Sequence, residues 1–85
     1  MKTPTWKQVE RFCQVDGWRE VRRSGHVFYE RVLADGTLLR THRSLSSGKT
    51  MSPGRFKAIL RHQLRVTEEQ FWRALATRQP VDRQP

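Results

Sequence analysis

Two apolar runs of the chain, residues 26–34 and 37–44, meet at Asp35-Gly36, and this pattern constrains the fold more than any other. An Asp-Gly pair between such runs predicts a tight antiparallel β-hairpin. Arginines fall on both faces of the alternating pattern, which indicates that one face of the sheet is exposed and basic. With a two-residue turn, the predicted facing pairs are Leu33 with Leu38, Val32 with Leu39, and Tyr29 with His42.

A helix and a strand are predicted before this hairpin. Thr5 and Gln8 have the spacing of a capping box, and Asp16-Gly17 is a usual helix end. Residues 18–22 are typical of a short strand, which a turn at Ser24-Gly25 follows. The first helix is expected to bury a stripe made of Trp6, Val9, Phe12 and Cys13.

A second helix is predicted after a connector over residues 45–51. Ser52 is its N-cap and Pro53 its first residue, and Thr67 with Gln70 opens a further short helix. The apolar residues of these two helices are Phe56, Ile59, Leu60 and Leu64, then Phe71, Trp72 and Leu75. The predicted fold is therefore α+β, in the order helix, three strands, helix and short helix. We expect one domain over residues 1–76 and a mobile tail over residues 77–85.

The charge of the chain is strongly unbalanced. Seventeen lysines and arginines oppose eight acidic residues, and the formal net charge is +9. Between Gly36 and Thr67 there is no acid, while the basic residues there are Arg40, Arg43, Lys49, Arg55, Lys57, Arg61 and Arg65. Such a block attracts polyanions, so nucleic acid is the favoured partner, with an acidic protein as the alternative.

Cellular location and cofactors are constrained by what the composition lacks. The apolar runs are too short to span a membrane, and the chain starts without the apolar region of a signal peptide. A single cysteine, Cys13, forms no internal disulfide and agrees with a reducing compartment. The histidines and the cysteine lack metal-ligand spacing. We expect a cytoplasmic protein with no membrane contact, no metal and no cofactor.

His26 is the candidate residue for chemistry. It follows Arg22, Arg23 and the Ser24-Gly25 bend, and its side-chain type transfers protons near neutral pH. Ribonucleolytic cleavage needs such a group and cations at the phosphate, which Arg22, Arg23, Arg43 and Lys49 would supply. Taken alone, a histidine at a strand end is more often structural. His42 and His62 are interpreted as packing or solvated residues.

Several short motifs, in their order and spacing, resemble the HicA family. They are Gly17-Trp18, Arg23-Ser24-Gly25-His26, Tyr29 and Phe56-Lys57-Ala58-Ile59-Leu60, and the similarity covers residues 6–64. HicA proteins are small toxins of bacterial and archaeal toxin–antitoxin pairs. The chain differs from the family pattern where Ser24-Gly25 replaces Gly-Ser and where Thr41-His42-Arg43 replaces a Pro-His pair. The helix expected over residues 67–76 is an addition to that pattern.

The resemblance implies both a fold and a function. The fold would be like a double-stranded-RNA-binding domain (α-β-β-β-α, dsRBD-like), with a three-stranded antiparallel sheet and two helices on one face. The activity would be metal-independent endoribonuclease cleavage of mRNA, and the partner a HicB-type antitoxin that covers the site. The catalytic histidine corresponds to His26 and the family's aromatic to Tyr29, which would support the histidine or stack on a base. The alternative function is a non-catalytic RNA-binding or protein-interaction module on the same fold.

Overall fold

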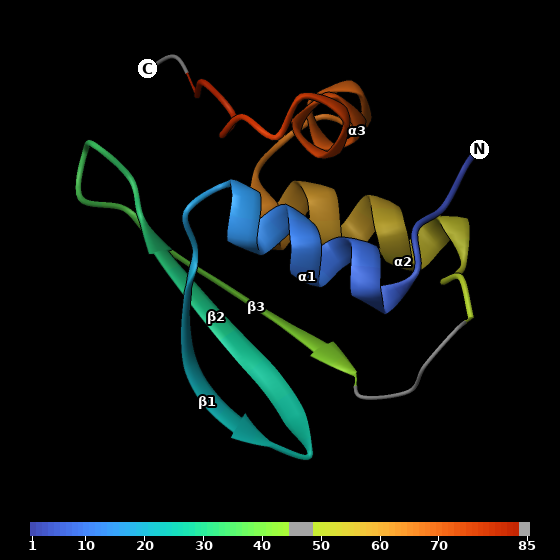
Figure 1. Cartoon of the computed structure of the whole chain (residues 1–85), viewed down its shortest axis with the longest axis horizontal. Helices are drawn as coiled ribbons and strands as arrows, with labels where there is room; N and C mark the ends of the chain where they lie inside the picture. The colour runs from blue at the N-terminus through green and yellow to red at the C-terminus, as the bar shows by residue number, and fades with distance from the viewer. Residues whose placement is uncertain (45–48, 84–85) are drawn as a thin grey trace.

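The protein is an α+β domain with a three-stranded antiparallel sheet and three helices, as the sequence order predicts (Figure 1). The computed structural model describes residues 1–44 and 49–83, so residues 45–48 of the predicted connector and the last two residues of the predicted tail lie outside it. In chain order the elements are α1 (Trp6–Val15), β1 (Arg19–Ser24), β2 (His26–Val32), β3 (Leu38–Ser44), α2 (Pro53–Ala58), the π-helical segment η1 (Ile59–Leu64) and α3 (Glu68–Thr77).

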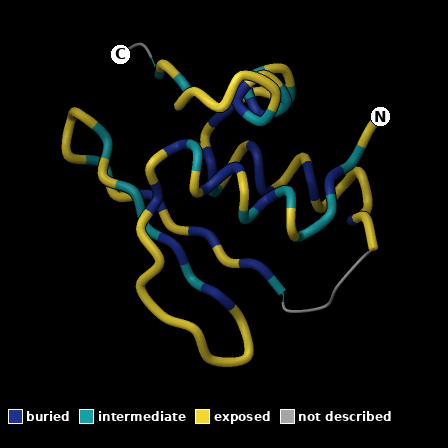
Figure 2. The backbone as a smooth tube through the Cα atoms, in the orientation of Figure 1, coloured by how far each residue is buried: buried dark blue, intermediate teal, exposed yellow. Residues whose placement is uncertain are grey.

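The helices cover one face of the sheet. The strands lie in the order β1-β2-β3, and side chains from β2 and β3 bond to both α1 and η1. Buried residues alternate with exposed ones along β3 and with half-buried ones in the first part of β2, whereas every residue of β1 is exposed (Figure 2). We call the helix-covered side the inner face and the other side the outer face.

Local capping signals in the sequence are confirmed. The Thr5 hydroxyl accepts from the Gln8 backbone N–H at 3.2 Å, and the Gln8 side chain accepts from the Thr5 N–H at 2.9 Å. The Thr67–Gln70 box at the start of α3 has the same two bonds, and the Ser52 hydroxyl caps α2. Helix α1 ends at Val15 with Asp16 as its C-cap, and Gly17 follows with a φ of +81° that suits glycine. These ends are set by side chains close in sequence, so they are predictable without the tertiary structure.

Three phenylalanines join the helices into one core. The Phe12 and Phe71 rings stack at 4.9 Å between centroids, and Phe56 meets Phe71 edge-on at 5.1 Å. All three side chains are fully buried. Helix α3 therefore completes the core and is not an appendage, because its Phe71 fills space between α1 and α2. Cys13 is buried on the same stripe of α1, as predicted.

The hairpin forms, but its predicted register is wrong by one residue. The Leu33 N–H donates to the Thr37 carbonyl and the Gly36 N–H donates to the Leu33 carbonyl, so the loop has three residues. Gly36, at φ +90°, takes the left-handed position that such loops require. The pairs are Val32 with Leu38, Tyr29 with Thr41, and Phe28 with His42. A slip of one residue exchanges the faces, which moves His42 from the side of Tyr29 to the outer face.

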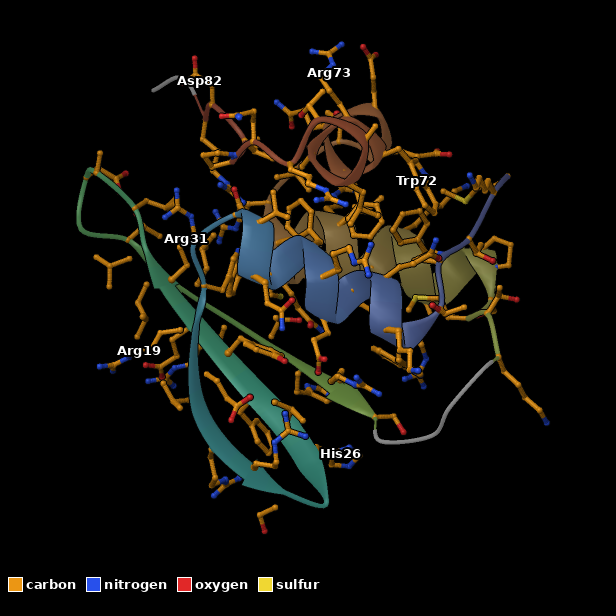
Figure 3. All side chains as sticks on the ribbon, in the orientation of Figure 1. Arg19, His26, Arg31, Trp72, Arg73 and Asp82 are labelled. Atoms are coloured by element: carbon orange, nitrogen blue, oxygen red, sulfur yellow. The ribbon has the colours of Figure 1, made fainter. Side chains whose placement is uncertain are left out.

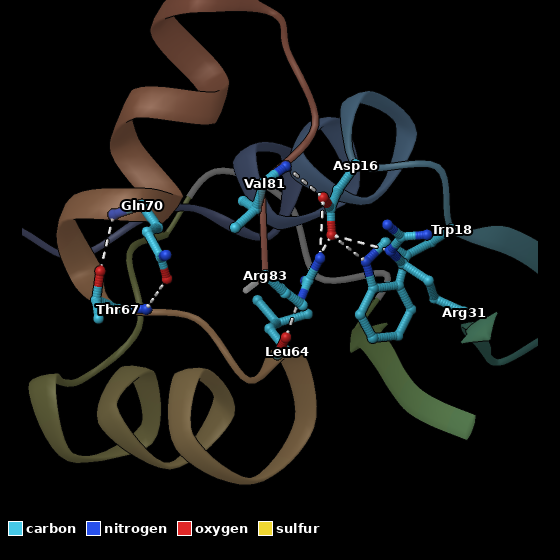
Figure 4. A network of polar contacts seen from close by, with 8 residues as sticks. All are labelled: Asp16, Trp18, Arg31, Leu64, Thr67, Gln70, Val81 and Arg83. Carbon is cyan, nitrogen blue, oxygen red and sulfur yellow. Dashed lines mark hydrogen bonds and ion pairs between the residues drawn. The ribbon is translucent and has the colours of Figure 1, made fainter. Parts of the chain in front are cut away.

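The C-terminal tail lies against the domain where a mobile segment was expected. Asp16 is fully buried and accepts from the Val81 N–H at 2.8 Å and from the Arg83 guanidinium at 2.6 Å (Figure 4). It also accepts from the Trp18 indole N–H at 2.9 Å, and Arg31 lies 3.6 Å away. A buried carboxylate needs such partners, and the tail supplies two of them without any apolar pattern in its sequence.

No helix in the described parts of the chain combines the length and the apolar character that crossing a bilayer requires. The longest helices are α1 and α3, each with ten residues and each carrying charged side chains on one side.

Candidate functional site on the outer face of the sheet

Three rings from two strands form a cluster on the outer face. The centroids of His26 and His42 are 5.5 Å apart, and Phe28 lies 6.2 Å from His26 and 5.7 Å from His42. We call this set of His26, Phe28 and His42 the ring cluster. Phe28 lies directly across from His42 in the ladder, and His26 is two residues before Phe28 on the same strand. The pleat therefore brings the three side chains to one side of the sheet.

The first turn places His26 at the end of this face. Ser24 pairs with His26 across the turn, and Gly25, at φ +72°, makes the connection in a left-handed conformation. Figure 3 shows His26 at the end of the sheet where β1 and β2 join, away from α3. An L-residue at position 25 would strain the backbone, even though a Cβ there would meet nothing within 4 Å. The Ser-Gly order in this chain thus allows the turn that presents the imidazole to solvent.

Cations surround the ring cluster. The Arg22 guanidinium carbon lies 4.4 Å from the Phe28 ring centroid, the geometry of a cation–π contact. A shallow hollow beside Phe28 and His42 is also lined by Arg40, Thr41 and Gln63. Arg40 donates to Glu30 at 3.0 Å on the outer face, while Arg55 of α2, on the helix side, lines a second hollow that reaches His42 from the edge of β3. The outer face therefore combines aromatic surface with positive charge, which suits a single-stranded nucleic acid.

The environment of His42 favours its neutral form. Partial burial of the imidazole lowers the pKa of His42, and the nearby charges of His26 and Arg55 lower it further. A neutral imidazole has a free nitrogen lone pair, so at neutral pH His42 is able to accept a proton.

Two of the expected RNA-binding residues, Tyr29 and Arg43, lie inside the protein. Tyr29 is 3% exposed and Arg43 is 7% exposed, and both donate to the Glu10 carboxylate of α1, at 3.0 and 2.8 Å. Both side chains come from the inner face, because their strand positions alternate with those of His26 and His42. The expectation that they contact RNA is therefore corrected: they hold α1 against the sheet.

Glu10 is matched electrostatically to these two partners. Partial burial tends to raise the pKa of Glu10, but the hydrogen bonds from Arg43 and Tyr29 and the charge of Arg43 outweigh it, so the pKa is lowered. Burial, together with the bond to Glu10, raises the pKa of the Tyr29 phenol. Tyr29 thus remains a neutral donor to an ionised carboxylate.

The other expected RNA-binding residues do not lie on one surface. Arg22 lies over the Phe28 ring of the ring cluster. Arg23 pairs in register with Val27, on the inner face, and donates to the exposed Glu20 at 3.0 Å. Lys49 is exposed and follows the undescribed residues 45–48. Of the six expected site residues, the structure brings His26 and Arg22 together at the ring cluster.

The sequence interpretation missed Phe28 and His42. Phe28 falls within a predicted apolar run, and the predicted two-residue loop places His42 opposite Tyr29. A signal for both exists, because position 36 is glycine in either loop type and a three-residue loop pairs Phe28 with His42.

In the described residues, no three His, Cys, Asp or Glu side chains gather in a way that would hold a metal ion. Comparisons of the chain with protein-family models, with curated proteins and with solved structures found no match.

Proposed function

We propose that the protein is a HicA-like toxin that cleaves mRNA, with His26 as a proton-transfer residue on the outer face of the sheet. The observation that carries the proposal is the ring cluster, in which the exposed His26 lies 6.2 Å from Phe28, and the Arg22 guanidinium lies over the same Phe28 ring. The finer dsRBD-like classification of the fold belongs to the same proposal. It is supported by the helix–strand order and by the two helices on the inner face.

The chemistry follows from the residue types. Cleavage within an RNA strand starts when a base removes the 2′-hydroxyl proton and the oxygen attacks the adjacent phosphorus. An imidazole is suited to proton transfer at neutral pH, and a cation stabilises the charge that develops on the phosphoryl oxygens. Arg22 lies within the site to contact a phosphate, and Phe28 offers its ring to a base. Chemistry of this kind requires no cofactor.

The partner of such a toxin would be a HicB-type antitoxin that covers the outer face. Basic residues with a net charge of +9 favour an acidic partner as well as RNA. The two would then compete for the same surface. A gene for an acidic protein next to the gene of this chain would support the pairing.

The test is cleavage of a mixed-sequence mRNA by the purified protein in the presence of a metal chelator. We expect cleavage, and the His26→Ala variant should lose about 10²- to 10⁴-fold in rate while keeping its fold and its RNA affinity. In cells, expression without a partner should arrest growth, and His26→Ala should relieve the arrest. His62→Ala is the matched control, because His62 is an exposed histidine on η1 outside the ring cluster.

Two results would contradict the proposal in different ways. Steep salt-dependent RNA binding without cleavage would favour a non-catalytic RNA-binding module that uses the same outer face. Undiminished cleavage by His26→Ala would show that His26 is not a catalytic residue.

A further inference from the structure

We propose that His42 is a second catalytic residue, which accepts the 2′-hydroxyl proton while His26 donates a proton to the leaving oxygen of the same phosphodiester. This inference rests on the proposed ribonuclease function and adds a residue to its site. It starts from the one-residue register difference, which places His42 on the outer face across from Phe28.

The distance between the two imidazoles suits one phosphodiester. Their ring centroids are 5.5 Å apart and the rings meet edge to face, inclined at 67°. In an in-line displacement the attacking and leaving oxygens lie on opposite sides of the phosphorus. Two imidazoles facing the outer side of the sheet are able to reach one oxygen each, within the 2.6–3.2 Å or so that proton transfer needs.

The surroundings of His42 decide which imidazole acts as the base and which as the acid. The charged groups that face it are His26 from β2, Arg55 from α2 and Arg40 from its own strand, of which Arg40 is paired with Glu30. Burial comes first among the causes that lower the pKa of His42, and the charges of His26 and Arg55 follow. A histidine held neutral is the better base. The protonated form of His26 is then left as the acid.

The proposed step balances in atoms and charge. The 2′-hydroxyl proton moves to a nitrogen of His42 as the 2′-oxygen forms its bond to phosphorus. The bond from phosphorus to the 5′-oxygen breaks, and this oxygen takes a proton from the His26 imidazolium. The products are a 2′,3′-cyclic phosphate and a 5′-hydroxyl end. Proton exchange with water then restores both histidines, with no oxidant, reductant or metal in the step.

The experiment compares His42→Gln, His26→Gln and His62→Gln on RNA and on a nucleoside 3′-(4-nitrophenyl phosphate). We expect each of the first two variants to lose about 10²- to 10⁴-fold in the rate of RNA cleavage, and His62→Gln to lose nothing. Nitrophenolate leaves without a proton. His26→Gln should therefore approach the wild-type rate on the nitrophenyl substrate, while His42→Gln should remain slow.

The pH profile supplies an independent readout. The wild type should give a bell-shaped profile of kcat/KM, because one imidazole must be neutral and the other charged. His42→Gln should lose the acidic limb of the bell and His26→Gln the alkaline limb. A residue that merely supports the sheet would lower the rate without removing a limb.

Three outcomes overturn the proposal, and they are distinguishable. A wild-type protein that does not cleave RNA overturns the ribonuclease function and this role with it. A cleaving wild type with an unchanged His42→Gln variant overturns the role of His42 alone. Recovery of His42→Gln, rather than His26→Gln, on the nitrophenyl substrate would overturn the assignment of base and acid. Circular dichroism and RNA affinity of each variant check that folding and binding are retained.

Discussion

The two faces of the sheet use the same kinds of residue in opposite ways. On the inner face, Arg43 and Tyr29 converge on the Glu10 carboxylate. On the outer face, Arg22 lies over the Phe28 ring, and both histidines neighbour the same ring. The inner-face and outer-face residues occupy alternating positions along the strands, and all three strands carry arginine. The inner set joins α1 to the sheet, whereas the outer set remains open to a ligand.

The difference shows that an arginine in a basic strand does not by itself mark a binding surface. A buried cation is costly unless a carboxylate pairs with it, so the buried Arg43 is found with Glu10 of α1. An exposed cation has little such cost and stays available to a phosphate. The partner of each charge, rather than the number of charges, separates the face that holds the helices from the face that is open to a ligand.

The largest loss of stability is expected when Asp16, the most buried charge of the inner side, is substituted. Asp16→Asn keeps the shape but removes the charge that pairs with Arg83 and Arg31. We expect a loss of about 3 kcal/mol in the free energy of unfolding, because buried cations lose their counter-ion. Denaturant-induced unfolding of the wild type and the variant measures this difference in unfolding free energy.

The control for Asp16→Asn is Glu69→Gln, which breaks an exposed ion pair with Arg73 on α3 and should cost less than about 0.5 kcal/mol. Equal losses for the two variants would show that the docked tail adds nothing to stability.

A smaller loss of stability is expected when Glu10, which joins the inner face to α1, is substituted. Glu10→Gln should cost about 2 kcal/mol, since bonds from Arg43 and Tyr29 lose their charged acceptor. Because the folded-state pKa of Glu10 is lowered, this contribution is present above the unfolded pKa of about 4.3 and is lost as pH falls through the folded value. The difference between wild type and variant in unfolding free energy should thus be constant above about pH 5 and shrink in acid.

Glu20→Gln serves as the exposed counterpart of Glu10→Gln, because Glu20 pairs with Arg23 at the surface. It should change stability by less than about 0.5 kcal/mol. A Glu10→Gln deficit that persisted unchanged at pH 3 would argue against an ionised Glu10 in the folded protein.

The smallest effect on stability, and the one confined to the outer face, is expected for Arg22→Gln. The unfolding free energy should stay within about 0.5 kcal/mol of wild type. RNA affinity should fall, and the slope of its logarithm against the logarithm of salt concentration should decrease by about 1, for one phosphate contact. Fluorescence anisotropy titrations at several salt concentrations measure this slope.

Arg73→Gln, on α3, removes an exposed cation far along the chain from the ring cluster and should leave the salt slope of RNA binding unchanged. If both variants lowered the slope equally, RNA would not be confined to the outer face.

Much of the fold was predictable from residues close together in sequence. The capping boxes at Thr5 and Thr67, the end of α1 just before Gly17 and the apolar stripe of α2 and η1 all formed as expected. In the candidate site, the exposure of His26 and of Arg22 followed from their position at the first turn. The interior positions of Tyr29 and Arg43 were not predictable in this way. They depend on which strand residues the helices cover and on Glu10, an acid more than thirty residues before Arg43 in the chain.

The sequence by itself determined that a hairpin forms at Asp35-Gly36 and that helices flank it, since turn and capping preferences are local. Tertiary structure decided the loop length, because an Asp-Gly pair fits both a two-residue and a three-residue loop. The choice depends on which register buries Tyr29, Thr41 and Leu39 beneath α1 and η1. That packing left His42 beside His26, and it created the pair of imidazoles on which the proposed chemistry depends.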